Sequence, residues 1–200
     1  MDISAYIKNI YLSIHLFKKF NYPWDITDNA EQIIRELIEN LSTEFIVRNG
    51  IAIHKSATVE SPVTLKAPVV VGKNCFIAAG SYLRGGVFFE ENVRVGPGCE
   101  VKSSFIFKDS TLAHFNYVGN SLIGSRVNIE AGAVIANHFN EREDKTIRVK
   151  MGEQEIIVST EKFGALVGDN CKIGANSVLS PGTILRPKSL VGRLELVKGL

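Results

Sequence analysis

The sequence has little of several features that mark particular classes of protein. Its 23 Lys and Arg residues nearly balance its 21 Asp and Glu residues, so the formal net charge of +2 lacks the excess typical of nucleic-acid-binding proteins. No apolar run approaches the ~18 residues needed to cross a bilayer, and we expect no membrane association. The N-terminus carries an early acid and no apolar segment followed by a small-residue cleavage site, which is unlike a signal peptide.

Cysteine is also scarce. Cys75, Cys99 and Cys171 are 24 and 72 residues apart, which is not the spacing of a metal motif. We expect all three to be small buried side chains with free thiols, which suits a reducing, cytoplasmic location. Glycine, in contrast, is abundant at 17 residues, and together with many Val and Ile it favours a β-rich fold with tight turns.

A large apolar residue recurs every six positions, with two slips of one residue and one long interruption. The anchors are Ile53, Val59, Leu65, Val71, Ile77, Leu83, Phe89, Val95, Val101, Ile106, Leu112, Val118, Ile123, Ile129, Ile135, Val167, Ile173, Leu179, Leu185 and Val191. Gly or Asn often follows three positions later, where a turn needs positive φ. A hexapeptide repeat of this kind predicts an all-β solenoid, the parallel β-helix.

The pattern predicts three parts: an N-terminal helical segment (1–48), the β-helix (49–193) and a C-terminal tail (194–200). Apolar residues at helical spacing in 3–17 and 33–41 indicate two amphipathic helices. We expect these helices to cap the first coil or to contact a partner, because the end of a solenoid exposes core and unpaired strands.

The repeat rules fail in one region of the sequence. Phe105, Phe115, Asn116, Leu122, His138 and Phe139 stand where small residues or turn formers belong. An inserted loop (137–163) interrupts the repeat, and its alternating apolar residues predict a β-hairpin that turns at Gly152. Functional sites are expected where local rules fail, and an insertion of this size usually serves function or assembly.

His114 lies in this irregular region, within the segment LAHFNYVGN. A neutral imidazole is a suitable general base near pH 7, although a single histidine is also often structural. Tyr117, Asn128 and Asn137 are polar residues on successive hexapeptides, but their convergence with His114 cannot be derived from spacing alone.

Three cations, Arg84, Lys102 and Lys162, occupy irregular or turn positions. Together they could hold a phosphate, since Arg binds two oxygens at once and Lys supplies a point charge. For each of them taken singly, composition alone favours a solvated surface charge.

Four strings are the most specific parts of the chain: YLRGG, VGPGCEVKSS, LAHFNYVGNSLIGSRVNIEAGAVIANH and EKFGALVGDN. Through them, residues 50–193 resemble the left-handed β-helix acetyltransferase domain of the bifunctional UDP-N-acetylglucosamine pyrophosphorylase/glucosamine-1-phosphate N-acetyltransferases and of related long-loop sugar-phosphate nucleotidyltransferases. The resemblance implies left-handed coils, a homotrimer, and acetyl-CoA bound along the prism between adjacent subunits.

The resemblance also implies roles for individual residues. His114 matches the catalytic base and Asn137 an active-site residue near the attacking amine. The substrate-binding positions fall on Arg84, Lys102 and Lys162 for the phosphate and on Tyr117 and Asn128 for the sugar, and the coenzyme positions fall on Ala175 and Arg193. The chain departs from the family pattern with His138 in place of Tyr, Ala175 in place of Ser and Glu130 in place of Gly.

The expected function is therefore acetyl-CoA-dependent N-acetylation of an amino-sugar phosphate resembling glucosamine 1-phosphate, with no metal required. An alternative is a non-catalytic trimeric module that binds a sugar phosphate or a separate nucleotidyltransferase, and a third possibility is a nucleotide-activated sugar as acceptor. The string NYPWDITDNAEQIIREL resembles the tail of a nucleotidyltransferase domain, but the chain has no GxGxR…PK loop. We expect no nucleotidyltransferase activity from this chain alone.

Overall fold

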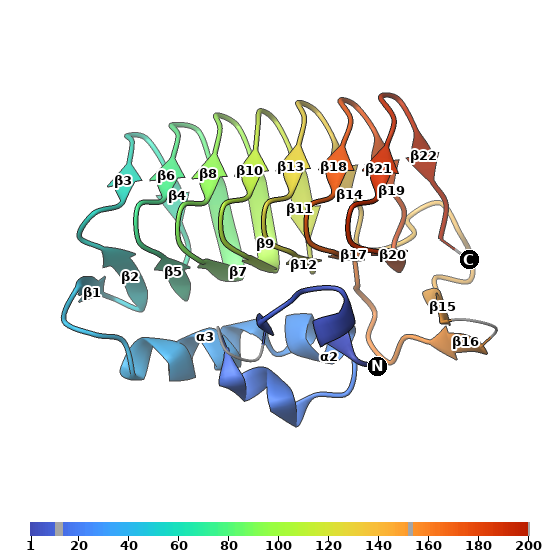
Figure 1. Cartoon of the computed structure of the whole chain (residues 1–200), viewed down its shortest axis with the longest axis horizontal. Coiled ribbons are helices and arrows are strands. Elements are labelled where there is room, and N and C mark those ends of the chain that lie inside the picture. The colour runs from blue at the N-terminus through green and yellow to red at the C-terminus, as the bar shows by residue number, and fades with distance from the viewer. Residues whose placement is uncertain (11–13, 152–153, 200) are drawn as a thin grey trace.

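The computed structural model describes residues 1–10, 14–151 and 154–199. The chain forms a left-handed β-helix whose short strands stack as a three-sided prism, with a helical segment running beside it (Figure 1). The predicted fold class is confirmed. Within the described residues, none of the helices combines the length and the apolar character that crossing a membrane requires.

Parallel pairing between successive coils builds each face of the prism. The first face contains β2 (Ile51–His54), β5 (Val69–Val71), the second halves of β7 (Tyr82–Phe89) and β9 (Glu100–Ile106), β12 (Leu122–Ile123), β17 (Ala165–Val167) and β20 (Thr183–Leu185). The second face contains β3 (Thr58–Val59), β6 (Phe76–Ile77), β8 (Arg94–Val95), β10 (Thr111–Leu112), β13 (Asn128–Ile129), β18 (Lys172–Ile173) and β21 (Leu190–Val191). The third face contains β4 (Thr64–Leu65), the first halves of β7 and β9, β11 (Tyr117–Gly119), β14 (Val134–Ile135), β19 (Val178–Leu179) and β22 (Leu196–Val197).

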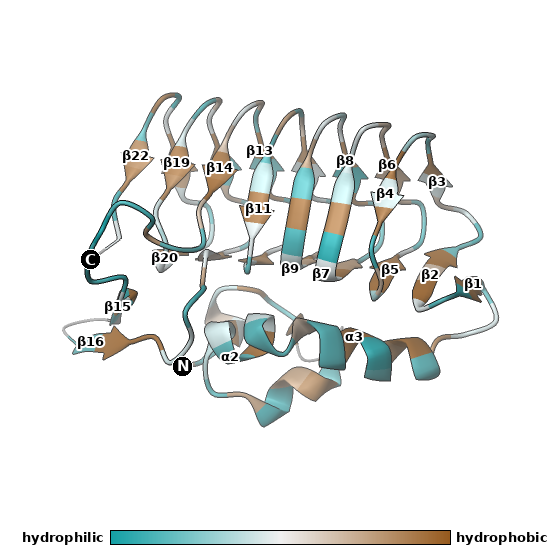
Figure 2. Ribbon diagram, turned by 180° about the vertical axis from the view of Figure 1, so that it is seen from behind, coloured by the Kyte–Doolittle hydropathy of each residue, from teal (hydrophilic) through white to brown (hydrophobic). Residues whose placement is uncertain are grey.

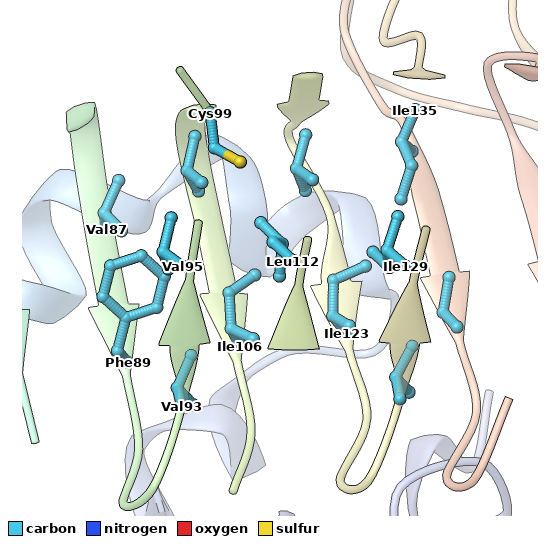
Figure 3. Close-up of a cluster of buried hydrophobic side chains, with 14 of the residues drawn as sticks. Val87, Phe89, Val93, Val95, Cys99, Ile106, Leu112, Ile123, Ile129 and Ile135 are labelled. Carbon is cyan, nitrogen blue, oxygen red and sulfur yellow. The ribbon is translucent and has the colours of Figure 1, made fainter. Parts of the chain in front are cut away.

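The inward side chains fill the prism along its length (Figure 3). All twenty predicted anchors belong to this core, and the three cysteines are buried in it as free thiols, as expected. Burial raises the pKa of the Cys75 thiol to about 11, which fits a structural role. The prism ends later than predicted, because β22 pairs with β19 and brings Val197 into contact with the core beyond the expected boundary at 193.

The first slip of the repeat, from Val101 to Ile106, lies at the corner that β9 crosses. β7 and β9 each cross a corner, and both combine hydrophobic and hydrophilic stretches (Figure 2). Their register shifts between Arg84 and Val87, where β7 carries one residue more than β9. Gly86 has φ +86°, and a Cβ there would lie 2.7 Å from the backbone nitrogen of Glu31. The second glycine of YLRGG therefore permits both the turn and the close approach of a helix.

The helices of the N-terminal segment lie along the side of the prism, and of the described residues of this segment only β1 pairs with the first coil. The segment contains the 3-10 turns η1 (Ile3–Ala5) and η2 (His15–Lys19) and the helices α2 (Pro23–Asp28) and α3 (Ala30–Glu39). These elements lie along the first face, where α3 contacts β5, β7 and β9 (Figure 1). β1 (Phe45–Arg48) then pairs antiparallel with β2 at the start of the prism.

Outward apolar residues on the first face account for this placement. Val70, Phe105, Leu122 and Leu166 are buried in a second hydrophobic cluster together with residues of the N-terminal segment. The rings of Phe17 and Phe105 meet edge to face with centroids 4.9 Å apart. Two residues that break the repeat, Phe105 and Leu122, therefore serve packing rather than chemistry.

A buried carboxylate holds the same segment to the prism. Asp169, which is 6% exposed, accepts hydrogen bonds from the backbone nitrogens of Lys8 at 3.0 Å and Ser125 at 2.8 Å. Its own backbone N–H donates to the Tyr6 carbonyl at 2.9 Å. Asp169 thus joins the N-terminal segment to two successive coils.

The inserted loop contains the predicted hairpin, formed by β15 (Arg148–Met151) and β16 (Gln154–Ile157). The turn predicted at Gly152 lies outside the described residues. The two ends of the loop meet at one corner of the prism, where the Phe163 N–H donates to the Asn137 carbonyl at 3.0 Å. The next residue continues the stack, because the Gly164 N–H donates to the Asn120 carbonyl at 2.9 Å.

Candidate functional site

Charged side chains gather where the third face turns into the first. Lys102 on β9 is in register with Arg84 on β7 and with Gly119 on β11. Arg84 donates from Nε and Nη2 to Oε1 of Glu100, at 2.8 and 2.6 Å. Lys162, at the end of the inserted loop, is the third cation. We call Arg84, Glu100, Lys102 and Lys162 the cationic corner.

The electrostatics of this corner favour an anion. The pKa of Lys102 is lowered, first by burial and then by the positive charges of Lys162 and Arg84, and only Glu100 opposes the shift. A partly buried ammonium that is repelled by its neighbours is stabilised by a ligand of opposite charge. Phosphate is a suitable ligand, since charge-assisted hydrogen bonds to it are among the strong ones.

Both lysines line a cavity of about 410 Å³. Its walls come from three parts of the chain: Thr27 and Asp28 from α2, Lys102, Ser103 and Asn120 from the prism, and Ser159 to Lys162 from the inserted loop. The Ser159 hydroxyl also hydrogen bonds to Asp25 of α2 at 3.3 Å. The N-terminal segment and the loop therefore close the cavity together.

Tyr117 and Asn137 lie beside the cationic corner. Tyr117 pairs with Glu100 across the strands, and its pKa is raised by burial and by the Glu100 charge, against the influence of Arg84 and of a hydrogen bond from Asn137. Asn137 is 4% exposed and donates from Nδ2 to Oδ1 of Asn120 at 2.7 Å. A Cβ at Gly119 would lie 2.7 Å from the Tyr117 hydroxyl, so this glycine makes the arrangement possible.

His114 lies at the opposite edge of the third face, in the turn between β10 and β11. Its side chain is exposed, and the neighbouring Phe115 is 71% exposed with φ +52°. Strand β11 separates this turn from the corner that contains Asn120. Within a single chain, therefore, the structure does not bring His114 to the three cations.

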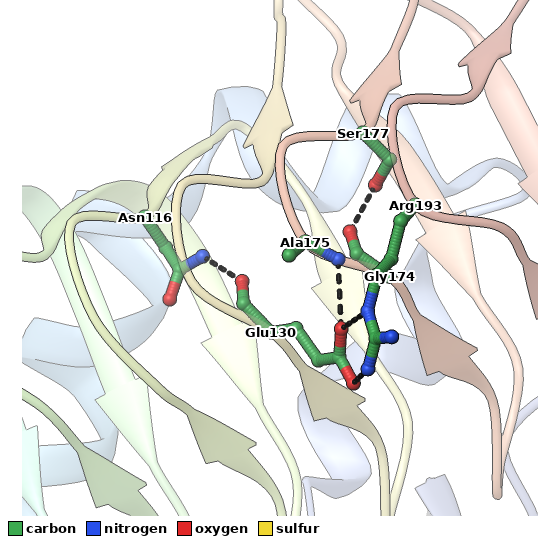
Figure 4. A network of polar contacts seen from close by, with 6 residues as sticks. All are labelled: Asn116, Glu130, Gly174, Ala175, Ser177 and Arg193. Atoms are coloured by element: carbon green, nitrogen blue, oxygen red, sulfur yellow. Dashed lines mark hydrogen bonds and ion pairs between the residues drawn. The ribbon is translucent and has the colours of Figure 1, made fainter.

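Asn128 lies on the second face, in β13, and Ala175 and Arg193 lie in the turns that lead from the second face to the third. The His114 turn is at the same corner of the prism, where the Gly132 N–H donates to the His114 carbonyl at 2.8 Å. Asn128, Glu130, Lys172 and Arg193 line a groove of about 260 Å³. The Glu130 carboxylate accepts hydrogen bonds from the backbone nitrogen of Ala175 at 2.9 Å and from Nε and Nη2 of Arg193 at 2.9 and 3.1 Å (Figure 4). Both predicted coenzyme positions thus bond to the same carboxylate. We call Glu130, Ala175 and Arg193 the Glu130 network.

Sequence reasoning missed Glu100. Outward positions of a strand are usually solvated, so a single glutamate there carries no signal. The available clue was its place two residues before Lys102 and one coil away from Tyr117. No group of three or more His, Cys, Asp or Glu side chains arranged to hold a metal occurs among the described residues.

Comparisons with known proteins find one matching family model and several similar proteins. The model of the hexapeptide repeat of succinyl-transferase matches residues 68–102 and 164–192. A bifunctional protein GlmU of Methanococcus vannielii is 29% identical over 88% of this chain. A bifunctional sugar-1-phosphate nucleotidylyltransferase/acetyltransferase of Sulfurisphaera tokodaii is 31% identical over 80%.

The chain spans about two fifths of the length of these relatives, 42% and 41% respectively. A shorter match of 35% identity to the bifunctional protein GlmU of Buchnera aphidicola covers 61% of this chain and 25% of that protein. The repeat, the three-sided prism and these matches agree. The chain is a left-handed β-helix with hexapeptide repeats and is similar to the bifunctional sugar-1-phosphate nucleotidylyltransferase/acetyltransferases, consistent with their acetyltransferase domain.

Proposed function

We propose that the protein transfers an acetyl group from acetyl-CoA to the amine of an amino-sugar phosphate of the glucosamine 1-phosphate class. The observation that carries the proposal is the cavity that contains both Lys102 and Lys162, next to Tyr117 and Asn137. The name of the Sulfurisphaera tokodaii relative pairs sugar-1-phosphate nucleotidylyl transfer with acetyl transfer. We expect a cytoplasmic enzyme that needs no metal for this reaction.

In this mechanism Lys102, Lys162 and Arg84 bind the phosphate, while Tyr117, Asn128 and Asn137 orient the sugar. The amine nitrogen attacks the thioester carbon, His114 accepts the amine proton, and collapse of the tetrahedral intermediate forms the amide and breaks the C–S bond. The proton then passes to the thiolate, giving free coenzyme A. Backbone N–H groups of the coils stabilise the oxyanion.

The separation of His114 from the cationic corner requires a second copy of the chain in this mechanism. We propose a homotrimer in which the His114 edge of one chain faces the cationic corner of its neighbour. Two features support this arrangement: His114 and Phe115 are exposed beside each other, and in the cationic corner Lys102 is repelled by Lys162 and Arg84. A large exposed aromatic ring is typical of a protein interface.

His114→Ala tests the catalytic assignment. We expect coenzyme A release with glucosamine 1-phosphate to fall about 100- to 10,000-fold, the usual contribution of a general base. The fold of each chain should stay intact, because the side chain is exposed within the single chain, and size-exclusion chromatography verifies that the trimer is retained. His15→Ala, which removes an exposed histidine of the N-terminal segment, is the matched control. Normal turnover by His114→Ala would reject the mechanism.

Mixing two inactive variants tests whether the site is shared. Trimers assembled from His114→Ala chains and Lys102→Gln/Lys162→Gln chains contain some interfaces with both an intact histidine edge and an intact cationic corner. We expect these mixtures to recover part of the activity after co-refolding. Absence of recovery, with mixed trimers verified by mass spectrometry, would show that the site does not combine residues from two chains.

The Glu130 network favours a second candidate, a non-catalytic trimer that binds a sugar phosphate or a separate nucleotidyltransferase. Glu130 already occupies the Ala175 N–H and the Arg193 guanidinium, the two predicted coenzyme positions. Calorimetry with acetyl-CoA separates the candidates, since a pure scaffold would show no binding heat. An acceptor panel that includes nucleotide-activated amino sugars, read by thiol release, identifies the acceptor.

A further inference from the structure

The Glu130 carboxylate makes two kinds of contact: a hydrogen bond to a backbone N–H of the next coil, which recurs in the prism, and an ion pair with Arg193, which distinguishes it. Glu60 directly follows an anchor, as Glu130 does, and accepts the backbone N–H of Ala79 in the next coil at 2.9 Å. The bond from the Ala175 N–H to Glu130 repeats this cap. The guanidinium of Arg193 distinguishes Glu130 from Glu60, for which no ion pair occurs within residues 1–10, 14–151 and 154–199.

The donors around the Glu130 carboxylate form an arrangement suited to anions. Two guanidinium N–H groups of Arg193 reach both of its oxygens, and the Ala175 N–H reaches Oε2 as well. A planar guanidinium of this kind matches phosphate oxygens as well as it matches a carboxylate. Lys172 lines the same groove and adds a positive charge.

The Glu130–Arg193 pair can open at little cost. The side chain of Arg193 is 74% exposed and that of Glu130 is 36% exposed, and ion pairs in such surroundings contribute little to stability. A phosphate can therefore replace the carboxylate without unfolding any part of the prism.

We propose that the groove lined by Arg193 and Lys172, together with the neighbouring Ala175 N–H, is a phosphate-binding site that Glu130 occupies in the free protein, so that Glu130 competes with the ligand and sets its affinity. This inference rests on the proposed function for the identity of the ligand, which is a phosphate group of the acyl-CoA. The geometry alone supports the chemical class, a phosphate-bearing molecule.

Isothermal titration with adenosine 3′,5′-bisphosphate tests the competition, because this probe carries phosphates and no thioester. We expect Glu130→Gln to bind the probe about three- to fivefold more tightly than the wild type, the range set by an exposed ion pair. Gln keeps an oxygen for the Ala175 N–H, so the fold is preserved. Glu60→Gln, which changes the equivalent cap, should leave the affinity unchanged.

The single variant Arg193→Ala and the double variant Glu130→Gln/Arg193→Ala show whether Glu130 acts through Arg193. If Glu130 acts through Arg193, Glu130→Gln has no effect in the Arg193→Ala background. An equal effect in both backgrounds would show only a long-range charge effect and would overturn the proposal, as would no probe binding by any variant.

Turnover separates this inference from the proposed function. Thiol release from acetyl-CoA should show the gain of Glu130→Gln as a lower KM, whereas the phosphate-free N-acetylcysteamine thioester should show none. If no thioester is turned over, the proposed function fails, but the bisphosphate titration still decides whether Glu130 competes for Arg193.

Discussion

The cationic corner and the Glu130 network differ in how their positive charges are balanced. At the corner, Lys102 is partly buried and is repelled by Lys162 and Arg84, and Arg84 alone has a short ion pair. In the network, Arg193 is mostly exposed and bonded to Glu130, and this contact raises the pKa of the guanidinium and lowers that of the carboxyl.

This difference predicts unequal affinities for the same chemical group. A phosphate entering the corner relieves repulsion that the folded chain already contains, so its binding is favoured. A phosphate entering the network must first displace the Glu130 carboxylate from Arg193. Its binding free energy is therefore reduced by the free energy of the Glu130–Arg193 contact that is lost. We therefore expect the corner to bind phosphate more tightly, whereas the affinity of the network should depend on how strongly Glu130 competes with the phosphate.

Removing both corner lysines should give the largest effect. With Lys102→Gln/Lys162→Gln we expect kcat/KM for a phosphorylated acceptor to fall at least about 100-fold, since each hydrogen bond to a charged group contributes about 1.5–3 kcal/mol. Unphosphorylated glucosamine should lose far less. Lys73→Gln, an exposed lysine at another corner, is the control. Equal losses for both acceptors would show that the lysines do not bind phosphate.

Much of the prism could be predicted, because its inward positions have a single physical requirement. Each anchor must fill the space between three faces, so the six-residue spacing from Ile53 to Val191 identified the core without any other information. The hairpin followed from alternation in 147–151 and 156–158 for the same reason. A local sequence pattern is sufficient to predict the structure where every repeat packs against the same surroundings.

Features that depend on packing between distant segments could not be predicted this way. Phe105 looked like a functional irregularity because the covering segment, with Phe17, is almost 90 residues earlier in the chain. The bond between Glu130 and Arg193 spans 63 residues and the inserted loop. The family resemblance named both residues, but only the closed coils show that they contact each other.

Loosening the N-terminal segment should weaken the corner and spare the network, because α2 lines the corner cavity with Thr27 and Asp28. Asp169→Ala removes two hydrogen bonds, of which the one from the Lys8 N–H holds this segment and the one from the Ser125 N–H lies within the prism, and we expect a loss of about 1–3 kcal/mol in unfolding free energy. Acceptor KM should rise several-fold, while bisphosphate binding at Arg193 stays constant. Urea unfolding and calorimetry measure the two effects.

Asp109→Ala provides the matched control for that experiment. Asp109 occupies a turn between the same two faces and accepts a hydrogen bond from Asn92, which is not part of the N-terminal segment. Its replacement should leave the acceptor KM unchanged. If Asp109→Ala raised KM as much as Asp169→Ala, the N-terminal segment would have no specific part in forming the cavity.

The smallest effect should be a shift in the titration of Lys102. Burial and the neighbouring cations lower its pKa in the folded protein, so it binds its proton less tightly than in the unfolded chain. Stability should therefore rise with pH between the folded pKa of Lys102 and its unfolded value near 10.5. Lys162→Gln removes the largest repulsion, which should raise the folded pKa and narrow this window.

Carbon-13 NMR of the Lys102 ε-methylene, followed from pH 7 to 12, measures this shift directly. The midpoint should move to higher pH in Lys162→Gln and stay in place in Lys73→Gln. It should not reach the ordinary lysine value, because burial is the leading cause of the shift and remains in the variant. An unchanged midpoint in Lys162→Gln would mean that the two ammonium groups do not share one cavity. The cationic corner would then differ from the Glu130 network only in how deeply its cation is buried.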